Sequence, residues 1–95
     1  MGNRKLIVMS GNGTVYAGKC RLHHVNQSPH GGELIFALTC NEGGANPFFV
    51  NDNTASAGPP YPTNDFGGAV VTDLAVASWT GTANPVVSFT IEPLE

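Results

Sequence analysis

The sequence predicts an all-β fold: a small antiparallel sandwich or open barrel of about six or seven short strands, with one long irregular loop. Short runs of β-branched and aromatic residues are separated by Gly, Asn, Ser and Pro, and only 12% of the residues are charged. β-branched and aromatic side chains favour strands, whereas Gly, Asn and Pro favour turns. The chain has 95 residues, so we expect a single domain over residues 1–95.

The first two strands are expected at residues 5–9 and 14–24, on either side of residues 10–13 (Ser-Gly-Asn-Gly). Asn-Gly is a strong hairpin signal, because both residues tolerate the positive φ angles of a type I′ turn. The sequence therefore predicts that these two strands pair. Alternation along the second strand places one set of residues on a common face: Tyr16, Gly18, Cys20, Leu22 and His24.

Residues 33–40 have the clearest strand pattern, with one apolar face made by Leu34, Phe36, Leu38 and Cys40. Pairing this face with the preceding strand places Cys20 opposite Cys40, so we expect both on the same face of adjacent antiparallel strands. Their sulfurs would then be close enough for a disulfide, and two buried, reduced thiols are the alternative. The lack of a signal peptide favours the reduced thiols.

The second half of the chain is less regular. Residues 47–50 fit a short edge strand, and residues 51–68 are the expected irregular loop. This loop is functional, a flexible tether, or a set of turns that covers the core. Residues 69–79 fit both helical and strand spacing, and their β-branched content favours a strand. Residues 86–92 form the last strand, whose inward side chains are Val87, Phe89 and Ile91.

The charges are unevenly distributed along the chain. The net charge is −3, all the cations lie between Arg4 and Arg21, and all the acidic residues lie from Glu33 onward. The cations are too few for a phosphate-tracking patch, so we expect no nucleic-acid partner. The asymmetry is either chance or a dipolar surface that orients one subunit against another.

Targeting and membrane signals are weak. Residues 4–9 resemble the start of a signal peptide, but the apolar run ends at Ser10, short of the ~7–15 residues that such a segment needs. No run approaches the ~20 apolar residues of a membrane span, so we expect no membrane partner. The sequence specifies no compartment.

Three histidines are the candidate metal ligands: His23, His24 and His30. Zinc binds imidazole and thiolate, so Cys20 or Cys40 could complete a ligand set. However, neighbouring residues of a strand point to opposite faces, which prevents His23 and His24 from binding one ion. We therefore expect no metal and no cofactor. The chain also lacks the sequence motifs of nucleophile elbows, phosphate loops, dinucleotide folds and zinc proteases, so no catalytic residue is assigned.

The candidate ligand-binding residues are Tyr61, Asn64, Asp65 and Phe66. Aromatic rings beside amides and carboxylates suit the recognition of a sugar or a peptide. The alternative is that Phe66 anchors the loop on the sheet, and that the nearby Trp79 belongs to the core.

These features predict a non-catalytic binding or assembly module, most simply a homo-oligomer or the partner of another protein, with a carbohydrate or small ligand as the second class of partner. Exposed strand edges are usually protected by charge, and the two candidate edges carry little. Residues 47–50 have no charge, and residues 86–92 have only Glu92. The alternative class is a small enzyme or metal-binding protein that uses the histidines at positions 23–30.

Overall fold

The computed structural model describes residues 3–27, 33–44, 46–53, 63–82 and 85–94. Their elements are β1 (Lys5–Met9), β2 (Gly13–Gln27), β3 (Leu34–Thr39), the 3₁₀ turn η1 (Asn41–Gly43), β4 (Phe49–Asn53), β5 (Thr63–Gly81) and β6 (Val87–Pro93). The strands form one six-stranded antiparallel sheet in the order β1-β6-β2-β5-β3-β4, which is not closed. The predicted all-β fold is confirmed.

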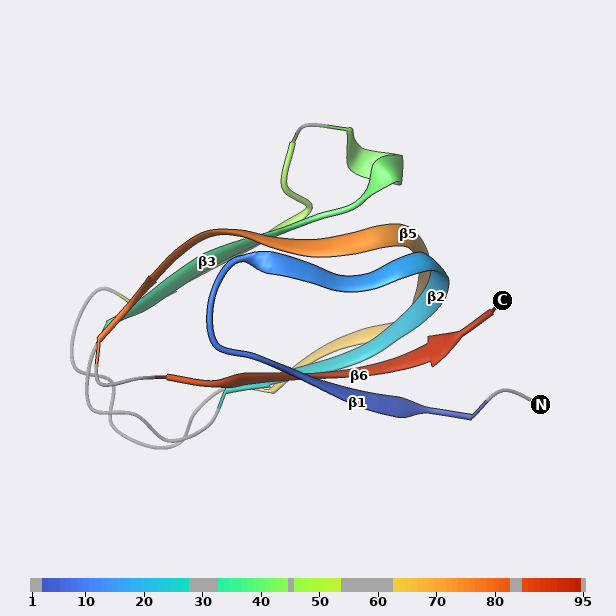
Figure 1. Ribbon diagram of the computed structural model, residues 1–95, viewed down its shortest axis with the longest axis horizontal. Coiled ribbons are helices and arrows are strands. Elements are labelled where there is room, and N and C mark those ends of the chain that lie inside the picture. The colour runs from blue at the N-terminus through green and yellow to red at the C-terminus, as the bar shows by residue number, and fades with distance from the viewer. Residues whose placement is uncertain (1–2, 28–32, 45, 54–62, 83–84, 95) are drawn as a thin grey trace.

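This single sheet bends back on itself into two layers (Figure 1). β2 and β5 are the longest strands, and both pass through the bend at the same end of the molecule. β1 and β6 lie in the layer with the second part of β2, and β3 lies in the layer with the second part of β5. The core fills the space between the layers, and its largest fully buried side chains include Leu22, Phe36, Leu74, Phe89 and Ile91.

An irregularity in the pairing of β2 with β5 accounts for the bend. Between Tyr16 and Lys19, β2 carries two residues where β5 carries only Asp73. Gly18 has φ +114° and Asp73 has φ +55°, and the Gly18 N–H donates a hydrogen bond of 2.8 Å to Asp73 Oδ1. An extra residue in one strand bends it and increases its twist. The bulge therefore lets both strands turn together without losing their pairing.

Most of the strand predictions are confirmed, with small changes at the ends. β3 and β6 have the expected apolar faces, and Val87, Phe89 and Ile91 are fully buried. β4 is an edge strand, and residues 69–79 are strand rather than helix. The simple alternation expected along β2 is wrong, because Val15 and Val25 are buried together with Cys20 and Leu22. The irregularities in the pairing of β2 break the alternation between Val15 and Cys20 and again between Leu22 and Val25.

The predicted hairpin between residues 5–9 and 14–24 is wrong. β1 pairs with β6, and β6 pairs with β2, so β6 lies between the two strands. The candidate edge at residues 86–92 is thereby corrected too, because β6 has neighbours on both sides. The Asn-Gly signal indicates only a local preference for a turn. When β6 lies between β1 and β2, its apolar side chains Val87, Phe89 and Ile91 become completely buried.

The predicted pairing of Cys20 with Cys40 is also wrong, because β5 separates β2 from β3. Cys20 lies opposite Val71 of β5, and both cysteines are buried free thiols. Burial raises the pKa of the Cys20 thiol, and the negative charge of Glu42 adds to this effect. The two thiols therefore belong to the apolar core and form no crosslink.

The predicted irregular loop at residues 51–68 is shorter than expected. Residues 51–53 end β4 and residues 63–68 begin β5, while residues 54–62 lie outside the described part of the chain. Gly67 and Gly68, which fall at the end of the predicted loop, have positive φ angles within a β-bulge of β5. Turn-forming residues can also occupy bulges, and this is why the boundary was misplaced.

Asn51 is a buried polar residue that links β4 to two other strands. Its Nδ2 donates to the Leu34 carbonyl at 2.9 Å, and its Oδ1 accepts from Gln27 Nε2 at 2.8 Å. Buried polar groups are costly to leave without partners. The pair of hydrogen bonds therefore explains how an asparagine in an edge strand can face the core.

Replacing Asn51 with alanine should destabilise the fold. The Asn51→Ala variant removes the donor to the buried Leu34 carbonyl, and we expect the free energy of unfolding to fall by about 1–3 kcal/mol. Urea denaturation followed by circular dichroism measures the change. Asn3→Ala, at an exposed position, is the control and should change the free energy by less than about 0.5 kcal/mol. Equal midpoints for Asn51→Ala and the wild type would contradict this account.

Candidate functional site

The predicted ligand-binding residues do not form one surface in the described part of the chain. Asn64, Asp65 and Phe66 lie on β5, and Tyr61 falls outside the described residues. The Phe66 ring packs edge-on against Phe49, with ring centroids 5.3 Å apart, and is partly buried against the core. Asp65 is exposed. Phe66 therefore closes the space between the layers, as expected if it anchors this segment on the sheet.

The Asp65 carboxylate makes contacts within its own strand and with the neighbouring strand. Its Oδ1 accepts a hydrogen bond of 2.8 Å from the Gly67 N–H, which supports the bulge of β5. Its Oδ2 lies 3.9 Å from His24 Nε2 of the neighbouring strand β2. Asn64 lies opposite Val25 in the same ladder. These contacts are local, and the sugar- or peptide-binding role of this segment stays a prediction.

The histidines of β2 lie on a bulge, which the sequence did not indicate. β2 carries one extra residue, His23, between Leu22 and His24 where it pairs with β6. The expectation that His23 and His24 point to opposite faces is therefore wrong, and their ring centroids are 6.5 Å apart. Among the described residues, no three side chains of the metal-binding types gather into one group, and His30 lies outside them.

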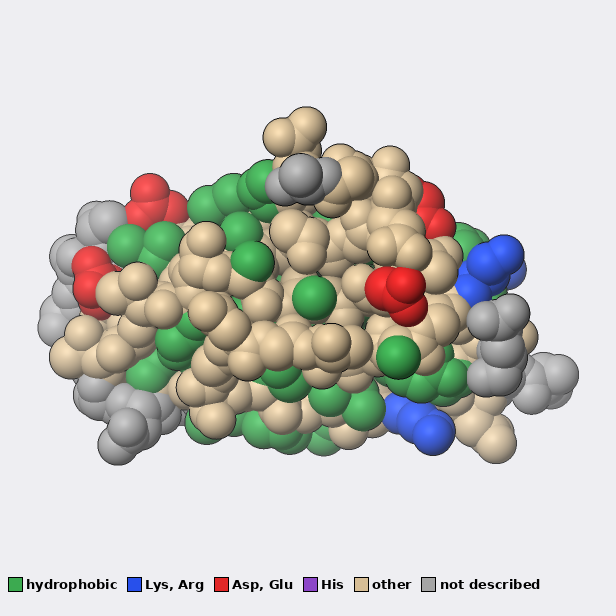
Figure 2. All heavy atoms as spheres, turned by 45° about the horizontal axis from the view of Figure 1, so that its top comes forward, with side chains coloured by type: hydrophobic (Ala, Val, Ile, Leu, Met, Phe, Trp, Pro, Cys, Tyr) green, Lys and Arg blue, Asp and Glu red, His purple; other side chains and the backbone are tan. Residues whose placement is uncertain are grey.

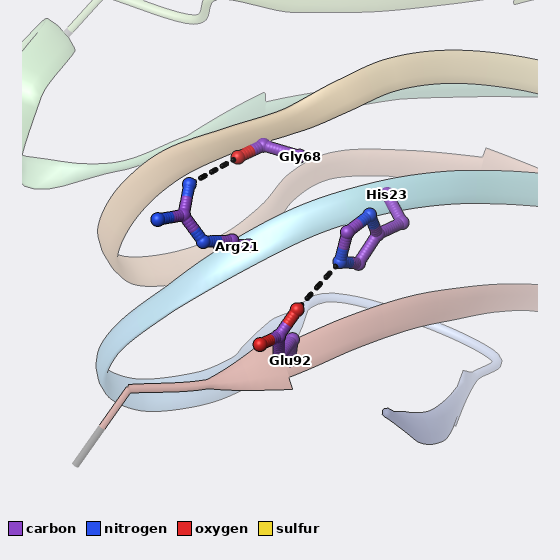
Figure 3. A network of polar contacts seen from close by, with 4 residues as sticks. All are labelled: Arg21, His23, Gly68 and Glu92. Atoms are coloured by element: carbon purple, nitrogen blue, oxygen red, sulfur yellow. Dashed lines mark hydrogen bonds and ion pairs between the residues drawn. The ribbon is translucent and has the colours of Figure 1, made fainter. Parts of the chain in front are cut away.

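A short polar network surrounds His23 (Figure 3). His23 Nε2 lies 3.1 Å from Glu92 Oε1 of β6, on the side facing β6. On the other side of β2, Arg21 Nη1 donates to the Gly68 carbonyl of β5 at 3.3 Å. The network therefore joins three neighbouring strands at the β2 bulge.

Glu42 has the most strongly shifted pKa among the described acids, and no sequence pattern indicated it. Thr72 of β5 donates to Glu42 from its hydroxyl and from its backbone N–H, both at 2.7 Å. These hydrogen bonds lower the Glu42 pKa to about 2. Glu42 therefore connects η1 to β5 by hydrogen bonds next to the bend.

The described residues form no pocket, and on the face shown in Figure 2 the apolar side chains lie in small groups among polar atoms. The large exposed apolar side chains are concentrated at the two sheet edges. Leu6 and Val8 of β1 are 63% and 55% exposed, and Val50 of β4 is 57% exposed. Phe48, just before β4, is 38% exposed. These two edges are the candidate functional site.

We define the β1 edge as residues 4–9 and the β4 edge as residues 48–53. The sequence predicted an edge strand close to the second of these ranges, and it did not identify the first as an edge. No local pattern distinguishes an edge strand from an inner one when both are short and apolar. The exposed Leu6 and Val8 were therefore identified only once the strand order was known.

A comparison of this chain with protein-family models, curated proteins and solved structures finds no match in any of the three. Within the part of the chain that the structure describes, no helix has the length and apolar character that a membrane span requires. The geometry of the two edges is therefore the basis for assigning a function.

Adding a side chain at Gly68 should disturb the β2 bulge. A Cβ there would lie 3.2 Å from His23 Cε1, and the backbone has φ +79°, which other residues rarely adopt. We expect Gly68→Ala to lower the free energy of unfolding by about 1–3 kcal/mol, measured by urea denaturation. Gly11→Ala is the control, because a Cβ at Gly11 meets nothing within 4 Å. Equal losses in the two variants would show that His23 does not restrict this position.

The Glu42 carboxylate should make stability depend on pH under acidic conditions. Its pKa is about 2 in the folded protein and near 4.5 when unperturbed, so the unfolded chain binds more protons between these values. The stabilisation is present above pH 4.5 and is lost as the pH falls towards 2. Thermal melting across this range should therefore show a shallower acid dependence for Glu42→Gln than for the wild type. Glu33→Gln is the matched carboxyl control, and an unchanged slope in Glu42→Gln would contradict the assignment.

Proposed function

We propose that this domain is a non-catalytic binding or assembly module that acts through its open sheet edges. The observation that supports this most strongly is the concentration of exposed Leu6, Val8 and Val50 on β1 and β4, the two outermost strands. An outermost strand presents unpaired backbone N–H and C=O groups, which can pair with a strand from another chain. Each edge thus offers hydrogen-bonding groups and apolar side chains together.

The charges near these edges support the same proposal. The usual protection of an edge is a charged side chain within the strand, especially Lys. Here Lys5 lies at the first position of β1 and Asp52 lies near the end of β4, so the middle of each strand carries no charge. The middle of each edge is therefore open to pairing.

Strand addition is the binding mode that fits these features. An extended segment that adds to an edge gains backbone hydrogen bonds for affinity and side-chain contacts for specificity. A domain of this size also buries only a modest core. It therefore gains proportionally more stability than a larger domain when an interface covers additional apolar surface. We therefore infer that the partner is a strand, and that self-association is the simplest form of the function.

A charge in the middle of an edge should prevent this association. Val8→Lys places a cation in the β1 edge, and we expect it to reduce the mass measured by sedimentation at micromolar concentration towards that of a single chain. The wild type should exceed the single-chain mass and increase its mass with concentration. Thr90→Lys is the control, since Thr90 lies on β6 and has strand partners on both sides, Leu6 of β1 and His24 of β2. A wild type that keeps the mass of a single chain at every concentration would refute the proposed function.

A further inference from the structure

We propose that the β1 edge of one copy pairs with the β4 edge of a second copy, in an antiparallel register that places Arg4 opposite Asp52. This inference rests on the proposed function and adds the identity of the partner, the register and the mode of assembly. It depends on three features of the described residues: the direction of the edge strands, the faces of their side chains and the position of their charges.

The strand directions suit a sheet that continues from one copy to the next. Every pair of neighbours in the order β1-β6-β2-β5-β3-β4 is antiparallel. The two outermost of the six strands therefore run in opposite senses along the sheet. When β4 of a second copy lies beside β1, the alternation of directions continues without a break. The outer face of one copy also continues into the outer face of the next.

The side-chain faces restrict the register. On β1, Leu6 and Val8 are exposed, whereas Ile7 and Met9 pack against the core. The β4 edge has the same parity: positions 50 and 52 are exposed, whereas the ring of Phe49 packs against the core and Asn51 is buried. Phe48, just before β4, is 38% exposed, and its ring also contacts Phe66 edge-on, with ring centroids 6.1 Å apart. Directly opposite residues of paired strands share a face, so even-numbered residues of one edge must meet even-numbered residues of the other. Only registers that differ by two residues are then allowed.

One of these registers matches every outward side chain with a suitable partner. It sets Leu6 opposite Val50, Val8 opposite Phe48 and Arg4 opposite Asp52. Apolar pairs and opposite-charge pairs on one face both stabilise paired strands. On the inner face, the same register brings Ile7 opposite Phe49.

The neighbouring registers are poorer. A shift by two residues in one direction sets Leu6 opposite the Asp52 carboxylate and leaves Arg4 beyond the end of β4. A shift in the other direction sets Arg4 opposite Val50 and Val8 opposite Asn46. Each shift places a charged or polar group against an apolar one, which costs free energy when the contact is desolvated. The matched register is therefore preferred.

The exposed apolar surface agrees with this choice of partner. The large exposed apolar residues among the described ones are Leu6, Val8, Phe48, Val50, Val70 and Leu94. The matched register covers four of these six, two from each edge, in one contact. A symmetric pairing of β1 with β1 of a second copy would cover Leu6 and Val8 but leave the β4 edge and Asp52 without a role. The head-to-tail pairing uses both edges and leaves one of each at the ends, so it produces an open chain of copies.

Charge reversal tests the register directly. In Arg4→Asp alone, or in Asp52→Arg alone, every junction sets like charges opposite each other. We expect association, measured by sedimentation at low salt, to weaken by about tenfold or more in each variant. An equimolar mixture of the two variants should recover, because every mixed junction again joins opposite charges. The double variant R4D/D52R should recover for the same reason.

A crosslink tests the geometry. Directly opposite residues of antiparallel strands have Cα atoms about 4.5–5.5 Å apart, which suits a disulfide. Oxidised Leu6→Cys/Val50→Cys should therefore give a ladder of dimers, trimers and longer species on a non-reducing gel. Leu6→Cys alone and Val50→Cys alone are the controls and should give no ladder. The native Cys20 and Cys40 are buried and are the same in all three proteins.

The outcomes separate this inference from the proposed function. In one outcome the wild type associates, Asp52→Arg associates equally well, the mixture shows no recovery and no ladder forms. This outcome would overturn the β1–β4 register but not the proposed assembly through the sheet edges. A wild type that sediments as a single chain under all conditions would overturn both. Recovery in the mixture together with a ladder in the double-cysteine variant would establish the head-to-tail register.

Discussion

The pairing of β2 with β5 through their shared bend is the constraint on which the rest of this structure depends. Among the described strands, only these two contribute to both layers, and they stay paired because Asp73 adopts a positive φ opposite the extra residue of β2. The Asp73 carboxylate accepts hydrogen bonds from the Gly18 N–H and from Asn41 Nδ2, both at 2.8 Å. Glu42, next to Asn41, holds Thr72 in the same way. The turn after β3 thus fixes the backbone of the bend.

The bend also decides where the sheet ends. Once β2 and β5 have turned back, the second part of β2 pairs with β6 and the second part of β5 pairs with β3. β1 then adds to β6, and β4 adds to β3. Both additions extend the sheet outward, and nothing in the topology of the described strands joins β1 to β4 within one copy. The two apolar edges are therefore a direct consequence of the central pairing.

Local sequence patterns predicted the strands well and their partners poorly. The apolar faces of β3 and β6 were identifiable because alternation is a property of a few consecutive residues. Strand order depends on contacts between distant segments, so the Asn-Gly signal and the match of Cys20 with Cys40 both led to wrong neighbours. The bulge at His23 was missed for a related reason. A bulge is stabilised by groups on other strands, such as Glu92 for His23 and Gly18 for Asp73, and these are far away in the sequence. The β4 edge was largely predicted, and the β1 edge was not.

The fold separates the charges that are unevenly distributed along the chain. Cations occur only up to Arg21 and acids only from Glu33 onward, and β1 and β4 come from these two parts of the sequence. Folding therefore places Arg4 and Lys5 at one edge of the sheet and Asp52 at the other. Like edges of two copies repel each other weakly, and unlike edges attract, with a strength that salt reduces. Backbone groups alone would let any two edges pair, so charge is what would favour the β1–β4 pairing that we propose.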